Sequence, residues 1–122
     1  MPLTLDENNS KYVIKAYQPG SVKINNEVFH TSVILNAEKC LPWKPQSLPE
    51  LSHDDFKILS EFSPDILILT TGEKLIFPEL ELYGDLINQG IGVEIMTSAA
   101  GARTFNALCA ENRNVTIALL IS

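Results

Sequence analysis

Short segments of alternating apolar and polar residues open the chain, and tight turn signals separate them. Pro19-Gly20 is a dipeptide suited to a type II turn, and Asn25-Asn26 can adopt the positive φ angles of a hairpin turn. β-branched and aromatic residues are concentrated between these turns, as is typical of strands. The pattern predicts an antiparallel β-meander with strands at residues 12–17, 21–24 and 28–35.

A proline-rich connection follows at residues 40–51, which read CLPWKPQSLPEL. Its three prolines exclude a regular helix and favour an extended, stiff backbone on the surface. Trp43 lies in the middle of this connection. It either clamps the connection onto the core or stacks against a ligand, because an indole suits both roles.

The next segment has the signals of an α-helix. Ser52 is a suitable N-cap, and Asp54 and Asp55 lie in the first turn, where the helix dipole favours negative charge. Pro64 is expected to end the helix. Helical spacing is shown by the apolar residues Phe56, Leu59 and Phe62.

Longer apolar runs dominate the second half of the chain. The run 65–72 (DILILTTG) is typical of a strand covered on both faces, and GVEIM at 92–96 and VTIALLI at 115–121 predict two more strands. A helix is predicted from about Pro78 to Gln89, with Gly90 at its C′ position. Its predicted buried stripe consists of Leu80, Tyr83, Leu86 and Ile87.

A second helix of this half is predicted from about Ser98 to Glu111, with Asn112 as its left-handed stop. Its small residues at 99–102 favour close packing of the helix on a sheet. Its predicted buried face consists of Ala102, Phe105, Leu108 and Cys109.

Strand, helix, strand, helix and strand in succession imply right-handed crossovers and a mostly parallel core. The predicted fold is therefore a single compact α/β domain, in which a mixed, mostly parallel β-sheet has flanking helices and an N-terminal antiparallel β-meander. The meander either extends that sheet or covers it. The domain is expected to span residues 11–122, after a flexible polar lead-in at residues 1–10.

Composition narrows the classes of partner and compartment. The net charge of the 122-residue chain is −6, without a basic run, which weighs against nucleic-acid binding. No apolar run is long enough to insert stably into a membrane, and the N-terminus lacks a secretory signal, so a cytoplasmic protein is expected. The widely spaced Cys40 and Cys109 are interpreted as reduced thiols.

The carboxyl ends of two parallel strands are the place where a ligand is expected to bind. One end supplies Gly72 and Glu73, and the other supplies Thr97 and Ser98 at a helix start, with Arg103 further along that helix. Backbone N–H groups of a first helical turn can bind a small anion. Equally, Thr97 or Ser98 can act only as the helix cap. The candidate crevice consists of Gly72, Glu73, Phe77, Glu94, Thr97, Ser98 and Arg103.

Glu94 is an unusual residue for a strand with two covered faces. Its carboxylate is expected to be at least partly buried and to need a partner, for which Arg103 is the natural candidate. A buried pair of this kind can be structural or functional, and the sequence leaves both open.

Recognised catalytic and metal patterns are missing from the sequence. Gly90-Ile91-Gly92 precedes a strand, so it is neither a dinucleotide fingerprint nor a P-loop. His30 and His53 lack zinc-site spacing, and no nucleophile elbow is present. No catalytic residue, cofactor or metal is therefore expected, and the balance favours a protein that is not an enzyme.

Residues 66–121 resemble a known family. The shared pattern falls on Thr70-Thr71-Gly72, Phe77-Pro78, Gly90-Ile91, Glu94, Met96-Thr97, Arg103-Thr104-Phe105-Asn106 and Glu111-Asn112-Arg113. It is similar to the domain-of-unknown-function 498 family (Mth938-like domain), which includes mitochondrial complex I assembly factor three. Thr70, Phe105 and Asn112 stand where the family pattern has glycine, tyrosine and glycine.

The resemblance implies a compact α/β domain and, for the mitochondrial relatives, assembly of a respiratory complex through protein contacts. The first functional hypothesis is therefore a non-catalytic interaction module with protein partners, resembling a respiratory complex assembly factor. The alternative is a binding protein or an enzyme that takes up a small molecule, such as an anion, in the crevice of Gly72, Thr97 and Arg103. An exposed apolar patch would favour the first hypothesis, and a concave pocket with these groups pointing inward would favour the second.

Overall fold

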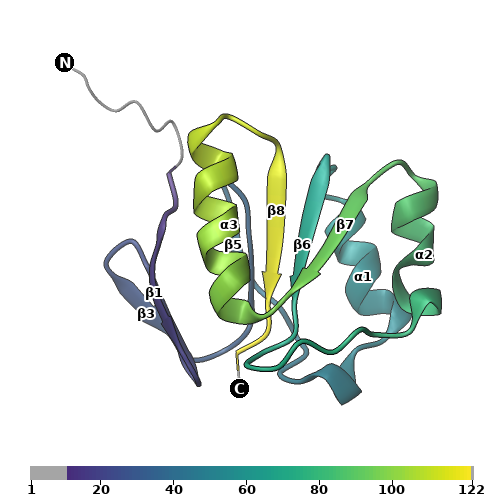
Figure 1. Ribbon diagram of the computed structural model, residues 1–122, viewed down its shortest axis with the longest axis horizontal. Helices are drawn as coiled ribbons and strands as arrows, with labels where there is room; N and C mark the ends of the chain where they lie inside the picture. Colours follow the sequence, from purple (N-terminus) through teal and green to yellow (C-terminus); the bar gives the residue numbers. More distant parts are fainter. Residues whose placement is uncertain (1–10, 122) are drawn as a thin grey trace.

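Two β-sheets and three α-helices are stacked in layers in the computed structural model, which describes residues 11–121 (Figure 1). The predicted lead-in at residues 1–10 lies outside the described residues. The elements are β1 Ile14–Gln18, β2 Ser21–Ile24, β3 Glu27–Phe29, β4 Val33–Leu35, β5 Cys40–Pro42, the 3₁₀ turn η1 Leu48–Glu50, α1 His53–Ser60, β6 Ile66–Thr70, α2 Leu80–Asn88, β7 Gly92–Met96, α3 Ser98–Ala110 and β8 Val115–Leu119.

The main sheet has five strands in the order β5-β4-β8-β6-β7. β6 pairs in parallel with both β7 and β8, so the predicted parallel core is present. β4 pairs antiparallel with β8 and with β5, which makes the sheet mixed. β1, β2 and β3 form a separate antiparallel sheet. The chain thus forms a single mixed α/β domain in which the meander covers the main sheet and β4 and β5 extend it.

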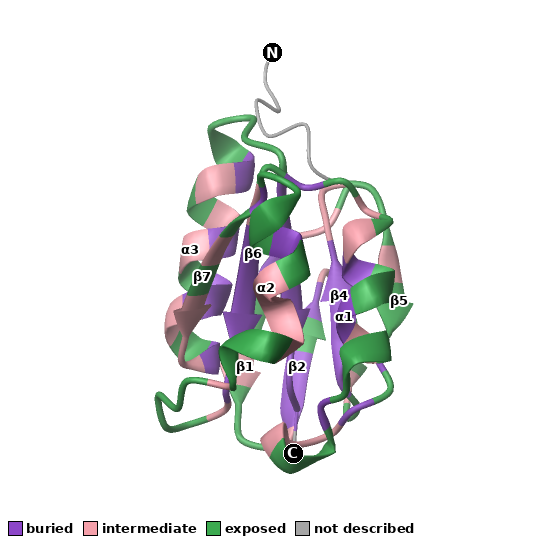
Figure 2. Cartoon of the chain, turned by 90° about the vertical axis from the view of Figure 1, so that its right-hand side faces the viewer, coloured by how far each residue is buried: buried purple, intermediate pink, exposed green. Residues whose placement is uncertain are grey.

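Two apolar clusters lie on opposite faces of the main sheet. On one face, α3 and the meander enclose Phe105, Ile14 and Ile117 within the first cluster. On the other face, α1 and α2 cover the second cluster, which includes Trp43 and Leu69 (Figure 2). The central strand β8 is buried at every position, because layers cover both of its faces.

The run 28–35 is not the single strand that its sequence predicts. It is divided between β3 in the meander and β4 in the main sheet. The division lies next to Ser32, which is fully buried. Its hydroxyl accepts the Ile121 N–H at 3.0 Å, and its carbonyl accepts the Trp43 N–H at 2.9 Å. These bonds to distant residues hold the chain where it passes from one sheet to the other. The local sequence pattern gives no sign of them.

The buried stripe of α2 is narrower than predicted. Leu86 is buried and Tyr83 half-buried, but Leu80 and Ile87 are 61% and 45% exposed. The difference follows from the position of α2, which lies beside the edge strand β7 and packs toward α1 (Figure 2). A helix beside the edge of a sheet has less of its surface covered than a helix over the centre of the sheet.

Trp43 clamps the proline-rich connection onto the core. It is 3% exposed, and its Nε1–H donates to the Asp55 carbonyl at 3.1 Å. Its ring meets the edge of Phe56 at 6.4 Å between centroids. Since the indole is enclosed by protein, the structural role of Trp43 is confirmed.

The predicted signals at three helix ends are present, but Pro64 does not end α1 as predicted. The helix ends at Ser60, because the backbone turns at Ser63 with φ +49°, and Phe62 lies beyond it. The Asp55 carboxylate accepts both the N–H and the hydroxyl of Ser52, at 2.9 and 3.0 Å, at the start of α1. Gly90 follows α2 with φ +89°, and Asn112 follows α3 with φ +62°. Both have the left-handed conformation that ends a helix.

Close approach of α3 to the main sheet depends on Gly101. A Cβ atom at this position would lie 2.6 Å from Thr70 Cγ2 and 3.2 Å from Ile68 Cγ2. Both neighbours are fully buried and β-branched, so they have little freedom to move. The small residue predicted to favour helix–sheet packing is therefore required at this point.

We expect Gly101→Ala to lower the free energy of unfolding by up to about 2 kcal/mol, since overpacking outweighs the gain in helix propensity. Gly84→Ala is the matched control, because a Cβ there meets nothing within 4 Å and Gly84 also lies inside a helix. The control should stabilise the protein by up to about 1 kcal/mol. Urea denaturation measures both. Equal stability of the two variants would contradict the close-packing role.

Candidate functional site

Ser98 joins three segments at the carboxyl edge of the main sheet. Its hydroxyl accepts the Gly72 N–H at 3.1 Å and donates to the Leu120 carbonyl at 3.4 Å. Its own N–H donates to the Gly72 carbonyl at 2.8 Å. Through these bonds the fully buried Ser98 holds the chain just after β6 and β8 to the start of α3.

Thr97 is the N-cap of α3. Its hydroxyl accepts the Ala100 N–H at 3.3 Å, and its carbonyl accepts the Gly101 N–H at 2.8 Å. With the N–H of Ser98 bonded to Gly72, three N–H groups at this helix start already have acceptors. The capping role is confirmed. The predicted anion site stays a prediction, with few backbone donors left to serve it.

Ser98→Ala is expected to lower the free energy of unfolding by about 1–3 kcal/mol, because it leaves the Gly72 N–H without its acceptor. Ser60→Ala is the control, since the Ser60 hydroxyl bonds only to a carbonyl of its own exposed helix end. Its effect should stay within about 0.5 kcal/mol. Thermal unfolding followed by circular dichroism compares the two. If the two variants had the same unfolding transition, the hydrogen bonds of Ser98 would not contribute to stability.

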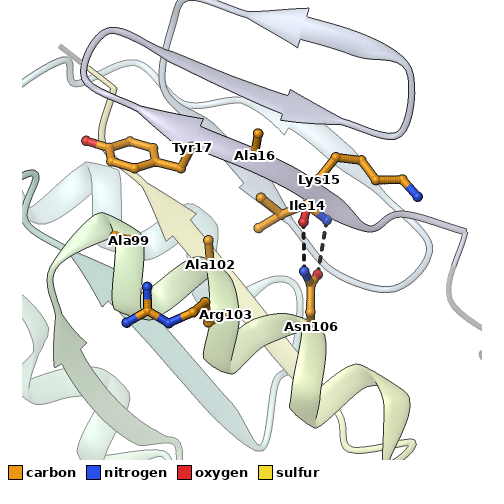
Figure 3. Close-up of a pocket in the computed structure, with 8 residues that line it drawn as sticks. All are labelled: Ile14, Lys15, Ala16, Tyr17, Ala99, Ala102, Arg103 and Asn106. Atoms are coloured by element: carbon orange, nitrogen blue, oxygen red, sulfur yellow. Dashed lines mark hydrogen bonds between the residues drawn. The ribbon is translucent and has the colours of Figure 1, made fainter.

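The predicted crevice residues do not form one site. Gly72, Glu73 and Thr97 line a surface hollow of about 380 Å³, together with residues of the β1–β2 turn. Arg103 lines an adjoining hollow of about 150 Å³ between β1 and α3 (Figure 3). Ser98 lies beneath the surface.

Phe77 and Glu94 lie apart from these two hollows. Phe77 is 67% exposed and lines a separate hollow with residues of η1 and the start of α2. Glu94 lines none of these hollows. The structure therefore brings together three of the predicted residues, Gly72, Glu73 and Thr97, and places Arg103 in the hollow next to them.

The expected burial of Glu94 and its pairing with Arg103 are wrong. Both side chains are exposed. Within residues 11–121 the contact between a basic and an acidic side chain is that of His53 Nε2 with Asp85 Oδ2, at 2.9 Å between α1 and α2. The reason is the strand order, which puts β7 at the edge of the sheet, where α3 leaves Glu94 uncovered.

A contact that the sequence did not reveal joins β1 to α3. The Asn106 side-chain amide accepts the Ile14 N–H at 3.0 Å and donates to the Ile14 carbonyl at 2.7 Å (Figure 3). This amide pairs with the outer edge of β1 as a neighbouring strand would. Asn106 belongs to the family pattern, but nothing in its local sequence indicates a partner 92 residues away.

The polar strand-end residue Thr70 also has a structural role. Its hydroxyl donates to the Ala118 carbonyl at 3.1 Å and accepts the Leu120 N–H at 3.0 Å. It thus adds a side-chain bridge between β6 and the end of β8. These internal bonds hold the strand ends, and Arg103 and Lys15 are exposed cations that line the neighbouring hollow.

The two cysteines are free thiols, as predicted. Partial burial raises the pKa of the Cys40 thiol, and the nearby Glu27 carboxylate raises it further. Such a thiol is a poor nucleophile at neutral pH. Within the described residues, no group of three or more His, Cys, Asp or Glu side chains is arranged to hold a metal ion.

Comparison with known proteins gives one relative of similar length and one longer relative. A Francisella tularensis protein named "13 kDa major membrane protein" is 26% identical over 122 residues, covering 98% of this chain and 99% of that protein. A Drosophila melanogaster protein named "NADH dehydrogenase [ubiquinone] 1 alpha subcomplex assembly factor 3" is 26% identical over 119 residues, covering 93% of this chain and 61% of that protein. A crystal structure from Bordetella parapertussis has a TM-score of 0.86 and 28% identity, covering 93% of this chain and 98% of that one.

Two findings concern the compartment of the protein. Between residues 11 and 121, the helices are too short or too polar to cross a bilayer. The Francisella relative is nevertheless named as a membrane protein. The cytoplasmic location expected from the sequence stays a prediction.

The family itself is clear from the extent of the match. A family model described as "Protein of unknown function (DUF498/DUF598)" matches residues 14–120. The match includes β1, which contacts Asn106, as well as the βα units from which the resemblance was identified. The chain therefore belongs to the DUF498/DUF598 family of proteins of unknown function.

Proposed function

We propose that the protein is a non-catalytic interaction module that binds a protein partner through an exposed apolar surface. The surface lies on the loop after β6 and on the first residue of α2, and we name it the apolar loop surface. It consists of Leu75, Ile76, Phe77 and Leu80, which are 52%, 50%, 67% and 61% exposed. This exposure is the observation that carries the proposal.

Apolar side chains in such a group gain free energy when a partner covers them. Burying one such side chain fully is worth about 1.5–3 kcal/mol. Aromatic residues such as Phe77 are enriched at the centres of protein interfaces. A hollow of about 360 Å³ beside the surface, lined partly by Leu48 and Leu82, offers a place for an apolar side chain of the partner.

The loop is held in place before any partner binds. The Thr71 hydroxyl accepts the Ile76 N–H at 3.3 Å and donates to the Lys74 carbonyl at 2.5 Å. Pro78 restricts the backbone further. A preformed surface loses little conformational entropy on binding, which favours affinity.

The assembly-factor name of the Drosophila relative supports a partner among the subunits of a membrane-bound or respiratory complex. Proteins that assist assembly must bind subunits and release them again. A small apolar surface on an otherwise acidic protein suits such transient contacts.

The test uses the tagged protein at native expression in its own host, with a photo-crosslinking residue at position 77. We expect reproducible crosslinks to one or a few subunits of a membrane-bound complex. The double variant Phe77→Asp, Leu80→Asp should abolish co-purification of those subunits, because charge is costly to bury at an interface. Thermal unfolding confirms that the variant is folded.

Val28→Asp is the matched control, since Val28 is 51% exposed on the meander, away from the loop. It should leave co-purification unchanged. Partners that survive the double variant, or the lack of any reproducible crosslink from position 77, would refute the proposal.

A further inference from the structure

We infer that the groove between β1 and α3 binds an extended acidic peptide segment, which pairs with the main chain of Tyr17 as an added strand. This site goes beyond the proposed function, since the apolar loop surface does not contribute to it. The inference rests on the hydrogen-bonding groups of the strand edge, on the room beside it and on the charges around it.

The groove is continuous along β1. Its first hollow lies between β1 and α3 and is lined by Ile14, Lys15, Ala16, Tyr17, Ala99, Ala102, Arg103 and Asn106 (Figure 3). Tyr17 and Ala99 also line the second hollow, which continues past the β1–β2 turn to Gly72, Glu73 and Thr97. Ala99 and Ala102 line this hollow from α3, and Ala99 is exposed, so a short side chain borders the groove at its surface.

The outer edge of β1 offers free main-chain groups in this groove. β1 is an edge strand, with β2 on its other side. Gln18 pairs with Ser21 across the two-residue turn, so this pair exchanges main-chain hydrogen bonds. Since such pairs alternate with non-bonded ones, Tyr17, opposite Val22, directs its N–H and carbonyl away from β2.

Asn106 demonstrates how this edge binds an amide. Its side chain satisfies both the N–H and the carbonyl of Ile14, the other outward-facing residue of β1. A peptide group placed beside Tyr17 would make the same two bonds. Addition of an extended segment to a sheet edge is a common mode of peptide recognition, in which main-chain bonds supply affinity.

The charges around the groove select the kind of segment. Arg103 and Lys15 line the first hollow, both are exposed, and neither forms an ion pair within the described part of the chain. Arg103 can bind a carboxylate through two parallel hydrogen bonds. Glu73 lines the far hollow. The expected segment therefore has an acidic side chain beside Arg103 and a neutral or basic one beside Glu73.

The test is a selection of random heptapeptides displayed on phage against the whole folded protein. We expect peptides with acidic residues among β-branched ones, and we expect dye-labelled copies of them to bind in fluorescence anisotropy. Ala99→Trp, which fills the groove, and Arg103→Glu, which reverses its charge, should each weaken binding about tenfold or more. In NMR, bound peptide should slow the hydrogen exchange of the Tyr17 amide.

Matched controls are Ala107→Trp and Arg113→Glu, at exposed positions that line neither hollow. Both should keep affinity within about twofold of the unmodified protein. Equal enrichment on the unmodified protein and on Ala99→Trp would overturn the inference, as would binding that leaves the Tyr17 amide unprotected. If inorganic phosphate or succinate alone displaces the peptides at similar concentrations, the groove is a small-anion site and the peptide inference is wrong.

Discussion

Phe105→Ala should lower the free energy of unfolding by about 3–5 kcal/mol. Phe105 is fully buried in the cluster that α3 shares with the meander and the main sheet. Its removal leaves a cavity that three separate layers surround, so the site cannot collapse around it. Because small domains are stable by only about 5–15 kcal/mol, this loss is a large share of the free energy of unfolding.

Phe77→Ala is the matched control for this prediction. The same atoms are removed, but Phe77 is 67% exposed on the loop after β6. Its substitution should change stability by no more than about 0.5 kcal/mol. Urea denaturation of both variants measures the difference. Comparable losses would mean that Phe105 is not the centre of the first cluster.

Trp43→Ala is expected to cost about 3–5 kcal/mol through the opposite face of the sheet. The indole is 3% exposed, packs edge-on against Phe56 and donates to the Asp55 carbonyl. Its loss removes the contact that fixes the proline-rich connection to α1. The melting temperature should fall accordingly, and the connection should become an early site of proteolysis.

Trp43→Phe separates the two contributions of the indole. It keeps most of the apolar contact and removes the Nε1–H donor, so it should cost about 1–2 kcal/mol. Calorimetry of the two variants compares them. If Trp43→Phe proved as damaging as Trp43→Ala, the hydrogen bond rather than the packing would hold the connection.

Secondary structure in the second half of the chain follows closely from local signals. β7 has the predicted bounds, and Ser52, Gly90 and Asn112 act at helix ends as expected. These features depend on residues a few positions apart, namely on turn conformation, caps and side-chain periodicity. Local physics is sufficient to specify them.

Burial at the edges of layers was not predictable in the same way. Glu94, Leu80 and Ile87 lie on elements that end the main sheet or flank its edge. Alternation along a strand indicates which side chains share a face, but not whether another layer covers that face. Strand order decides this, and strand order depends on contacts between distant segments.

The candidate site also has one part that local sequence signals indicate and another part that depends on contacts between distant segments. The sequence indicated the carboxyl ends of parallel strands and thereby found Gly72, Glu73 and Thr97, which do line one hollow. It had no signal for the other wall, because β1 reaches α3 through the contact of Asn106 with Ile14. The groove exists only once the meander has docked on the helix.

By itself, the sequence determined the α/β class, the parallel βα units, the helix ends and the family, since each depends on local chemistry or on a motif order. Only the tertiary structure decided that the meander forms a separate sheet, that β7 is an edge, that the apolar loop surface is exposed, and that a hollow lies between β1 and α3. The physical reason is that the exposure of a side chain depends on how the sheets and helices are stacked. A side chain is buried or free according to which distant segment covers it.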